Sequence, residues 1–213
     1  MTTNPEPKCG IQECAYHDSA NPHTCDYLWK PVIQELVRRH VSRAFELGCG
    51  TGAFASHLAV RGIDVTGVDP SKSGVTIANN AHPGLRIEVG SSHEDLRSRF
   101  GTFPAVISLE VVEHVYYPRR FARCIADLLE PRGVALITTP YHGYWKNLLM
   151  AITGRMDAHF TALWDDGHIK FWSRKSLKIL LEEQCLKVID IKGLGRIPTL
   201  SKAMLAIAVK IPQ

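Results

Sequence analysis

The sequence contains no long hydrophobic run, no apolar segment in its first ten residues and no regular cysteine pattern. Its longest uninterrupted apolar stretch covers residues 203–209, far short of the roughly 20 residues that a membrane-spanning helix needs. The first ten residues are polar and have no apolar centre like that of a signal peptide. Six cysteines are spread irregularly, and Cys49 and Cys124 fall in segments expected to be buried. We therefore expect a cytoplasmic protein with reduced thiols.

Internal repeats, low-complexity tracts and strong charge bias are also absent. The chain has 213 residues, 45% of them hydrophobic and 22% charged, which is typical of one soluble globular domain. Its net charge of +4 is dispersed, with short basic pairs at 38–39 and 119–120. This pattern is typical of a solvated surface and makes a nucleic-acid partner unlikely. It predicts no particular oligomeric state.

A glycine-rich turn at residues 45–52 organises the rest of the chain. An apolar approach leads to glycines at alternate positions 48, 50 and 52, and residues 53–59 then suit a helix. Glycines allow positive φ angles and let a ligand touch the main chain, while the helix offers unpaired N–H groups to an anion. The next strand, 63–68, ends at Asp69, which is placed to accept hydrogen bonds from ribose hydroxyls, as in dinucleotide sites.

Strands and helices alternate through most of the chain. This alternation predicts an α/β fold with a doubly wound, mostly parallel sheet covered on both faces. Ligands then bind beyond the carboxyl ends of the strands. A helix is expected over 26–40, with Pro31 in its first turn. The expected strands are 44–47, 63–68, 85–89, 105–109, 134–138, 188–191 and 205–209, and the other helices are 53–61, 72–81, one opening at Pro118 and one capped by Ser173.

Three motifs in this order resemble those of class I S-adenosylmethionine-dependent methyltransferases. They are ELGCGTG at 46–52, GVDPS at 67–71 and EVVEHV at 110–115, and the last resembles the ubiquinone-biosynthesis O-methyltransferase branch. The resemblance extends in outline over residues 23–210. It implies a seven-stranded Rossmann-like methyltransferase fold that ends in an antiparallel hairpin, with S-adenosylmethionine as cofactor. The G-x-G-x-G spacing and the absence of a second substrate domain disfavour a nicotinamide dehydrogenase.

The resemblance also implies cofactor contacts. In the family the helix before the first strand can cover the cofactor, so Lys30 or Trp29 is a candidate for its methionine carboxylate, although a plain helix-start residue is the simpler account of each. The loop after the third strand lies beside the adenine in the family, whereas its Ser91-Ser92 pair also suits a simple turn. The candidate cofactor-binding residues are Lys30, Gly48, Cys49, Gly50, Gly52, Asp69, Pro70, Ser91, Ser92 and Leu109.

Two mechanisms for removing a proton from an acceptor hydroxyl are compatible with the sequence. If a helical turn begins at Glu110, then Glu113 and His114 lie on its face, and such a set suits a divalent ion such as Mg or Zn that acts as a Lewis acid. Members of the ubiquinone branch carry E-x-x-E-H there as a metal-binding set. Small-RNA 3′-end 2′-O-methyltransferases have a similar centre, which implies His168, in the segment 167–172, as a fourth ligand. Alternatively the two glutamates merely favour a helix N-terminus.

The second mechanism uses a histidine as general base, without a metal. His114 and His142 are both expected at the carboxyl edge of the sheet and to titrate near neutrality. A further cluster lies in the N-terminal arm, residues 1–25, before the main domain at 26–213. It is either a zinc site or part of a flexible arm over the cofactor mouth, and comprises Cys9, Cys14, His17, His23 and Cys25.

Between the fifth strand and Trp172 the alternation breaks, leaving an insertion at 140–172. Aromatic residues crowd its start, and a helix from about Tyr144 is expected to end at Gly154. The insertion is either a substrate lid over the active site or an ordinary packing helix. We predict methyl transfer to a hydroxyl oxygen of an aromatic or polyol small molecule. The alternatives are N-methylation of a heterocycle, 2′-O-methylation of an RNA end, and a non-catalytic cofactor-binding relative.

Overall fold

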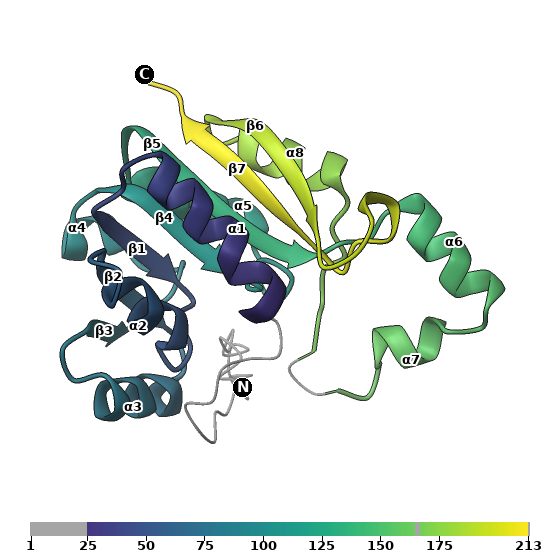
Figure 1. The fold of residues 1–213 in the computed structure, drawn as a ribbon, viewed down its shortest axis with the longest axis horizontal. Coiled ribbons are helices and arrows are strands. Elements are labelled where there is room, and N and C mark those ends of the chain that lie inside the picture. The colour runs from purple at the N-terminus through teal and green to yellow at the C-terminus, as the bar shows by residue number, and fades with distance from the viewer. Residues whose placement is uncertain (1–24, 165–166, 213) are drawn as a thin grey trace, which may run out of the picture.

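A seven-stranded sheet forms the centre of the molecule, as the computed structural model of residues 25–164 and 167–212 shows (Figure 1). The strand order is β3-β2-β1-β4-β5-β7-β6, and β7 runs antiparallel to both of its neighbours. The predicted α/β, mostly parallel sheet with a terminal hairpin is therefore confirmed. The strands are β1 Arg43–Leu47, β2 Asp64–Asp69, β3 Arg86–Val89, β4 Phe103–Leu109, β5 Leu129–Pro140, β6 Leu186–Leu194 and β7 Ala203–Lys210.

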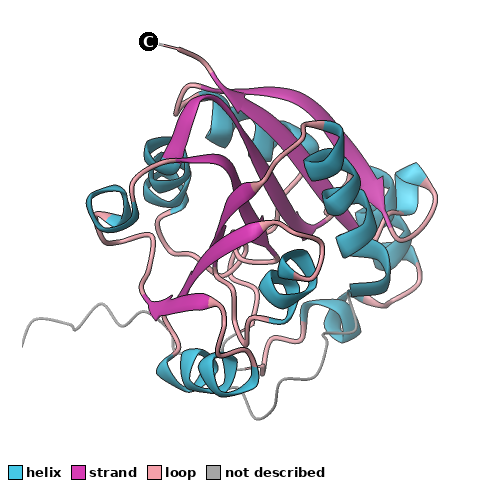
Figure 2. Ribbon diagram, turned by 60° about the vertical axis from the view of Figure 1, so that its left-hand side comes forward, coloured by secondary structure: helices cyan, strands magenta, loops and turns pink. Residues whose placement is uncertain are grey.

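Helices cover both faces of the twisted sheet (Figure 2). One apolar cluster joins the sheet to α1, α2 and α3, and a second joins the opposite face to α4, α5 and α8. Successive residues of a strand alternate between the two clusters, as in β4, where Ile107 belongs to one cluster and Val106 to the other. The helices are α1 Cys25–Arg38, α2 Ala53–Ala59, α3 Lys72–Ala81, α4 Leu96–Phe100, α5 Pro118–Leu128, α6 Tyr144–Ile152, α7 Met156–Phe160 and α8 Arg174–Glu182, with a short 3-10 helix η1 Pro198–Leu200.

Strand β1 lies between β2 and β4, so the winding of the chain reverses at its carboxyl end. The first half of the chain builds outward from β1 to β3, and the second half builds the other way from β4. The connections that follow β1 and β4 therefore leave a crevice beyond the carboxyl ends of these strands. All three sequence motifs lie at this edge.

Local sequence signals account for several helix boundaries. Ser173 caps α8, because its Oγ accepts from the N–H of Ser176 at 3.2 Å while the Ser176 side chain accepts from the N–H of Ser173. Pro118 opens α5, as expected. The expectation that Pro31 lies in the first turn of its helix is wrong, because α1 begins at Cys25. The helix continues through the proline because its apolar face is buried against the sheet.

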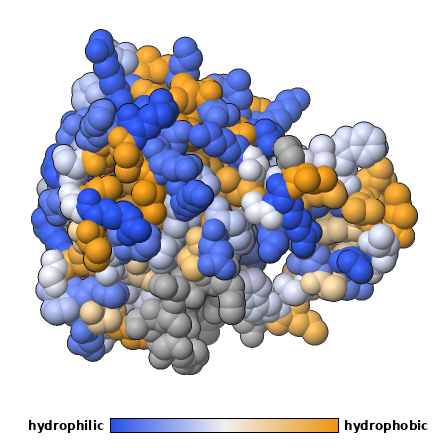
Figure 3. Space-filling view, viewed as in Figure 1, coloured by the Kyte–Doolittle hydropathy of each residue, from blue (hydrophilic) through white to orange (hydrophobic). Residues whose placement is uncertain are grey.

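The insertion at 140–172 contains two helices that extend away from the sheet (Figure 1). Met150 is the buried residue of α6, and the other side chains of this helix are partly or fully exposed. The choice between a substrate lid and a packing helix therefore stays a prediction. It ends at Ile152, before Gly154, and α7 follows as an element that the sequence did not predict. Apolar side chains gather on the surface of this projecting part (Figure 3). None of the helices in the described part of the chain is long and apolar enough to cross a membrane.

Candidate functional site

The turn after β1 depends on its glycines. Gly48 has φ 82° and Gly52 has φ 75°, both in the left-handed region. A Cβ atom on Gly48 would lie 2.5 Å from Cγ2 of Val111, and one on Gly52 would lie 2.5 Å from Cδ1 of Ile87. The Val111 contact brings the turn at 48–52 directly against the segment that follows β4.

Asp69, at the end of β2, holds this turn through both carboxylate oxygens. Oδ2 accepts the N–H of Gly50 at 2.8 Å and Oδ1 accepts the N–H of Ser71 at 2.9 Å. Burial raises the pKa of Asp69, and these two hydrogen bonds act in the opposite direction. Each carboxylate oxygen has a second lone pair, so a role toward ribose hydroxyls stays a prediction. Pro70, the residue between Asp69 and Ser71, is half-buried.

Glu46 was not among the predicted site residues, although its carboxyl group lies beside this turn. Its side chain is buried, and Oε2 has no hydrogen-bond partner among the described residues. Burial, and then the nearby charge of Asp69, raise the pKa of Glu46 to about 8, while the backbone N–H of Ala55 acts in the opposite direction. The signal in the sequence was an acidic residue inside an otherwise apolar strand, directly before the glycine turn.

The other candidate cofactor residues have different environments. The loop serine Ser91 is buried, and its Oγ accepts from the N–H of His93 at 3.3 Å, so it takes part in turn chemistry. Trp29 packs against the rings of Phe54 and His57, at 5.4 and 4.7 Å between centroids, which is a structural role in the contact between α1 and α2. The remaining candidates comprise one buried residue, Cys49, and others that are partly or fully exposed, namely Ser92, Leu109 and Lys30.

Glu110 and Glu113 lie on a turn rather than on a helix. Glu110 has φ 54°, so the expected helical turn does not begin there, and α5 starts later, at Pro118. Burial raises the pKa of Glu110 to about 7. Burial, and then the charge of Glu110, raise the pKa of Glu113 well above its usual range. Oε1 of each glutamate is buried and has no hydrogen-bond partner among the described residues, whereas Oε2 of Glu113 accepts from Thr139 Oγ1 at 3.0 Å.

Three of the four residues considered as metal ligands come together. Ligand atoms of Glu113, His114 and His168 all lie within 4.8 Å of one another, and Glu110 is outside this group. The segment that carries His168 is fixed by the main chain, because the carbonyl of Glu113 accepts the N–H groups of Ile169 and Lys170, both at 3.0 Å. Two parts of the chain separated by more than 50 residues therefore converge on one cluster.

His142 is buried among rings of the insertion. Its ring centroid lies 5.3 Å from that of His159, 5.8 Å from that of Phe160 and 5.0 Å from that of Phe171. Burial, followed by the charge of Lys146, lowers the pKa of His142 to about 4. The expectation that His142 titrates near neutrality is therefore wrong, because the apolar surroundings disfavour the imidazolium. A neutral imidazole with this pKa is a weak base at pH 7.

The cysteine and histidine cluster predicted for the N-terminal arm lies outside the described residues, apart from Cys25. That residue opens α1 and is half-buried. Cys49 and Cys124 are buried, as expected.

Comparisons with known proteins agree with this geometry. Residues 22–191 match the model of a family described as a methyltransferase domain. The ubiquinone biosynthesis O-methyltransferase of Dinoroseobacter shibae is 30% identical over 188 residues, which cover 82% of this chain and 74% of that relative. The enzyme of the same name from Cereibacter sphaeroides is 28% identical over the same shares of both chains.

Solved structures share the fold. The methyltransferase domain of a bacterial CtHen1 superimposes with a TM-score of 0.65 at 20% identity, over 85% of this chain and 96% of that one. Magnesium protoporphyrin IX methyltransferase from Synechocystis PCC 6803, solved with bound SAH, gives 0.63 at 18% identity, over 85% and 81%. The chain is thus an enzyme of the class I S-adenosylmethionine-dependent methyltransferases, and it belongs to their ubiquinone-biosynthesis O-methyltransferase branch.

Proposed function

We propose that this enzyme transfers the methyl group of S-adenosylmethionine to a hydroxyl oxygen of an aromatic or polyol small molecule, at the carboxyl edge of β1, β2 and β4. The observation that carries the proposal is the contact between Gly48 and Val111. Through it, the turn proposed for the cofactor meets the segment bearing Glu113 and His114. The names of the curated relatives favour an oxygen acceptor over a nitrogen heterocycle, an RNA end or a non-catalytic role.

The cofactor is proposed to lie against the main chain at 48–52. The N–H groups of Ala53 and Phe54, which open α2 directly after this turn, suit the methionine carboxylate. Asp69 is proposed to bind the ribose hydroxyls, and Glu46 adds a buried carboxyl group beside the cationic part of the cofactor. Ser91, Ser92, Pro70 and Leu109 would line the adenine and ribose, and Lys30 would approach from α1.

The cluster of Glu113, His114 and His168 fits a divalent ion. One carboxylate and two imidazoles are a donor set that zinc accepts in catalytic sites, whereas magnesium prefers oxygen ligands. The fit is supported by Oε1 of Glu113, which is buried and has no hydrogen-bond partner among the described residues, and by the second carboxyl group of Glu110 nearby. When bound, such an ion supplies Lewis-acid chemistry that lowers the pKa of a hydroxyl group.

The protein's own residues would position the reactants and exclude water. Methyl transfer from a sulfonium requires the acceptor oxygen, the methyl carbon and the sulfur to lie in line. The insertion at 140–172 is proposed as a substrate lid, because Trp164 lies beside the rings of His114 and His168, at 6.4 and 5.5 Å between centroids. Since His142 has a pKa of about 4, we assign it to the wall of this site rather than to proton removal.

The proposal is tested by metal content and methyl transfer measured on the same protein. Wild type, His168→Ala and His40→Asn are loaded with zinc, dialysed and analysed by atomic emission. His40 is the control because it is exposed at φ 52°, where asparagine is tolerated. We expect about one zinc per chain in wild type and control and a loss in His168→Ala. Equal zinc in all three proteins would contradict the metal assignment.

The acceptor is identified with radiolabelled S-adenosylmethionine. Catechols, phenols, polyols and N-heterocycles are offered to the zinc-loaded enzyme and to enzyme treated with EDTA. We expect label on a hydroxylated acceptor, lost after chelation and restored by zinc. Full transfer after chelation would contradict the role of the metal but leave O-methylation intact, whereas label on nitrogen acceptors alone would contradict O-methylation.

A further inference from the structure

A cavity of about 550 Å³ lies between α6, α7 and the link from β6 to β7. Its size falls in the range of small-molecule sites. The apolar part of its lining comes from both helices of the insertion and from η1, and comprises Leu149, Met150, Ala158 and Leu200. Neither the glycine turn nor the cluster of Glu113, His114 and His168 contributes to it, so this cavity is separate from both parts of the proposed active site.

Four cationic side chains line the same cavity, namely Lys146, Arg155, Arg196 and Lys202. No carboxylate is among its described lining residues, and none of the four takes part in an ion pair between described residues. The ammonium of Lys146 donates to the carbonyl of Tyr141 at 2.8 Å, and that of Lys202 lies 5.3 Å from the centroid of the Tyr27 ring.

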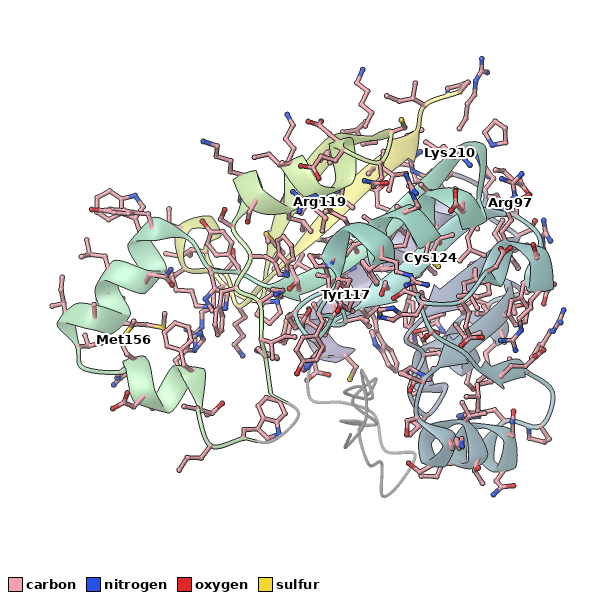
Figure 4. The ribbon with its side chains drawn as sticks, turned by 180° about the vertical axis from the view of Figure 1, so that it is seen from behind. Arg97, Tyr117, Arg119, Cys124, Met156 and Lys210 are labelled. Atoms are coloured by element: carbon pink, nitrogen blue, oxygen red, sulfur yellow. The ribbon has the colours of Figure 1, made fainter. Side chains whose placement is uncertain are left out.

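No carboxylate among the described lining residues offsets the electrostatic repulsion among these four cations. Burial, and then the charge of Arg196, lower the pKa of Lys146, while Glu110 acts in the opposite direction from the neighbouring site. Several other surface arginines have a carboxylate partner, as Arg119 has in Glu183 at 2.6 Å. Figure 4 shows Arg119 on the opposite side of the molecule from the view of Figure 1. Cations collected around an apolar cavity without carboxylates favour an anionic ligand.

We propose that this cavity binds a small amphiphilic anion, an apolar chain or ring that ends in a phosphate or carboxylate. The anionic group would meet Arg155 and Arg196, which are exposed at the rim, and the apolar part would lie on Leu149 and its neighbours. A simple inorganic anion leaves the apolar lining unused, and a neutral apolar molecule leaves the cations unused. The ligand class therefore needs both parts.

The cavity lies next to the proposed active site, so a ligand bound there would affect that site. The binding proposal itself does not require the proposed function to be correct. His159 lines the cavity, and its ring lies 5.3 Å from that of His142, which is in the wall of the proposed acceptor site. Lys146 likewise lies between the cavity and Glu110. An occupied cavity would hold α6 and α7 together beside the acceptor.

Binding is measured by calorimetry on the full chain, without any methyl transfer, using octyl phosphate, inorganic phosphate and 1-octanol as probes. We expect octyl phosphate to bind at least about tenfold more tightly than either of the others, since it alone meets both the cations and the apolar lining. Arg155→Glu/Arg196→Glu should lose this binding. The matched control, Lys175→Glu/Lys187→Glu, changes the charge equally on exposed residues of α8 and β6 and should retain it.

A further variant separates the contribution of the apolar lining from that of the cations, and circular dichroism checks the fold. Leu149→Ser alters a side chain that is 48% exposed, so the fold should persist, and it should weaken octyl phosphate binding but not the weak binding of inorganic phosphate. Circular dichroism confirms folding of each variant. Equal affinities for octyl and inorganic phosphate would overturn the proposal, as would equal loss in the test and control variants. Adsorption to phosphatidylglycerol vesicles without binding of monomeric octyl phosphate would also overturn it.

Discussion

Replacing Glu46 with glutamine should remove a large part of the pH dependence of folding stability. Glu46 is 2% exposed and its pKa is raised from 4.5 to about 8, first by burial and then by the charge of Asp69. Between these two pH values the folded protein keeps the carboxyl proton, whereas the unfolded chain releases it. The folded state therefore binds more protons, and its stability falls as pH rises through this window.

The magnitude follows from the size of the shift. One pKa unit corresponds to about 1.36 kcal/mol, so the wild type should lose about 2–3 kcal/mol of stability between pH 5.5 and pH 7.5 through this group. Glutamine is nearly isosteric with protonated glutamate but stays neutral at every pH. The variant should therefore match the wild type below about pH 4.5, be the more stable protein above it, and exceed the wild type most near pH 7.5.

Urea unfolding at half-unit pH intervals, in the absence of cofactor, measures this difference. Other buried acids such as Glu110 and Glu113 contribute to both proteins, so subtracting the two profiles isolates Glu46 together with its coupling to Asp69. Glu182→Gln is the control, because Glu182 is exposed on α8 and its removal should leave the pH profile unchanged. Parallel profiles for wild type and Glu46→Gln would refute the reasoning, because they would mean that Glu46 titrates normally.

Two further predictions concern the same edge of the sheet. Gly48→Ala forces a residue with a side chain into the left-handed region and places its Cβ 2.5 Å from Val111. We therefore expect the free energy of unfolding, measured in urea, to fall by about 1–3 kcal/mol. A decrease below about 0.5 kcal/mol would show that the turn adapts. Asp69→Ala removes the acceptor proposed for the ribose and should weaken S-adenosylmethionine binding by about 1–3 kcal/mol in calorimetry. Asp64→Ala, at the exposed start of β2, is its control, and equal affinities in these two variants would remove Asp69 from the cofactor site.

The order of the elements was predictable because the apolar pattern changes period along the chain. Residues 72–81 were predicted as a helix and form α3 with those bounds, since Ser71 provides a cap that accepts from the N–H of Gly74 at 3.2 Å. Short elements were missed. Helix α4 has five residues, too few to show a helical repeat, and its capping Asp95 was indistinguishable from an ordinary loop residue.

The site was less predictable because it depends on backbone geometry and on distant contacts. Nothing in the type of residue at position 110 indicates a positive φ, since glutamate rarely adopts it. Glu110 has this conformation and lies outside the group formed by Glu113, His114 and His168. His168 was found through a family resemblance, because no periodicity relates residues so far apart in the chain. The low pKa of His142 results from tertiary burial within the insertion.

Three buried acids at the carboxyl edge of the sheet lack, within the described part of the chain, some of the hydrogen-bond partners that a stable core would provide. Glu46, Glu110 and Glu113 each have one buried oxygen without a partner among the described residues, and each has a raised pKa. An unsatisfied buried group costs about 1–3 kcal/mol, so a core built for stability alone would have apolar residues there. Such a concentration of acidic oxygen is favourable once a cation lies beside it, and both a sulfonium cofactor and a divalent ion carry that charge. Because a ligand that binds the folded state stabilises it, the binding of these cations would offset the destabilisation that the unpartnered carboxyl oxygens impose.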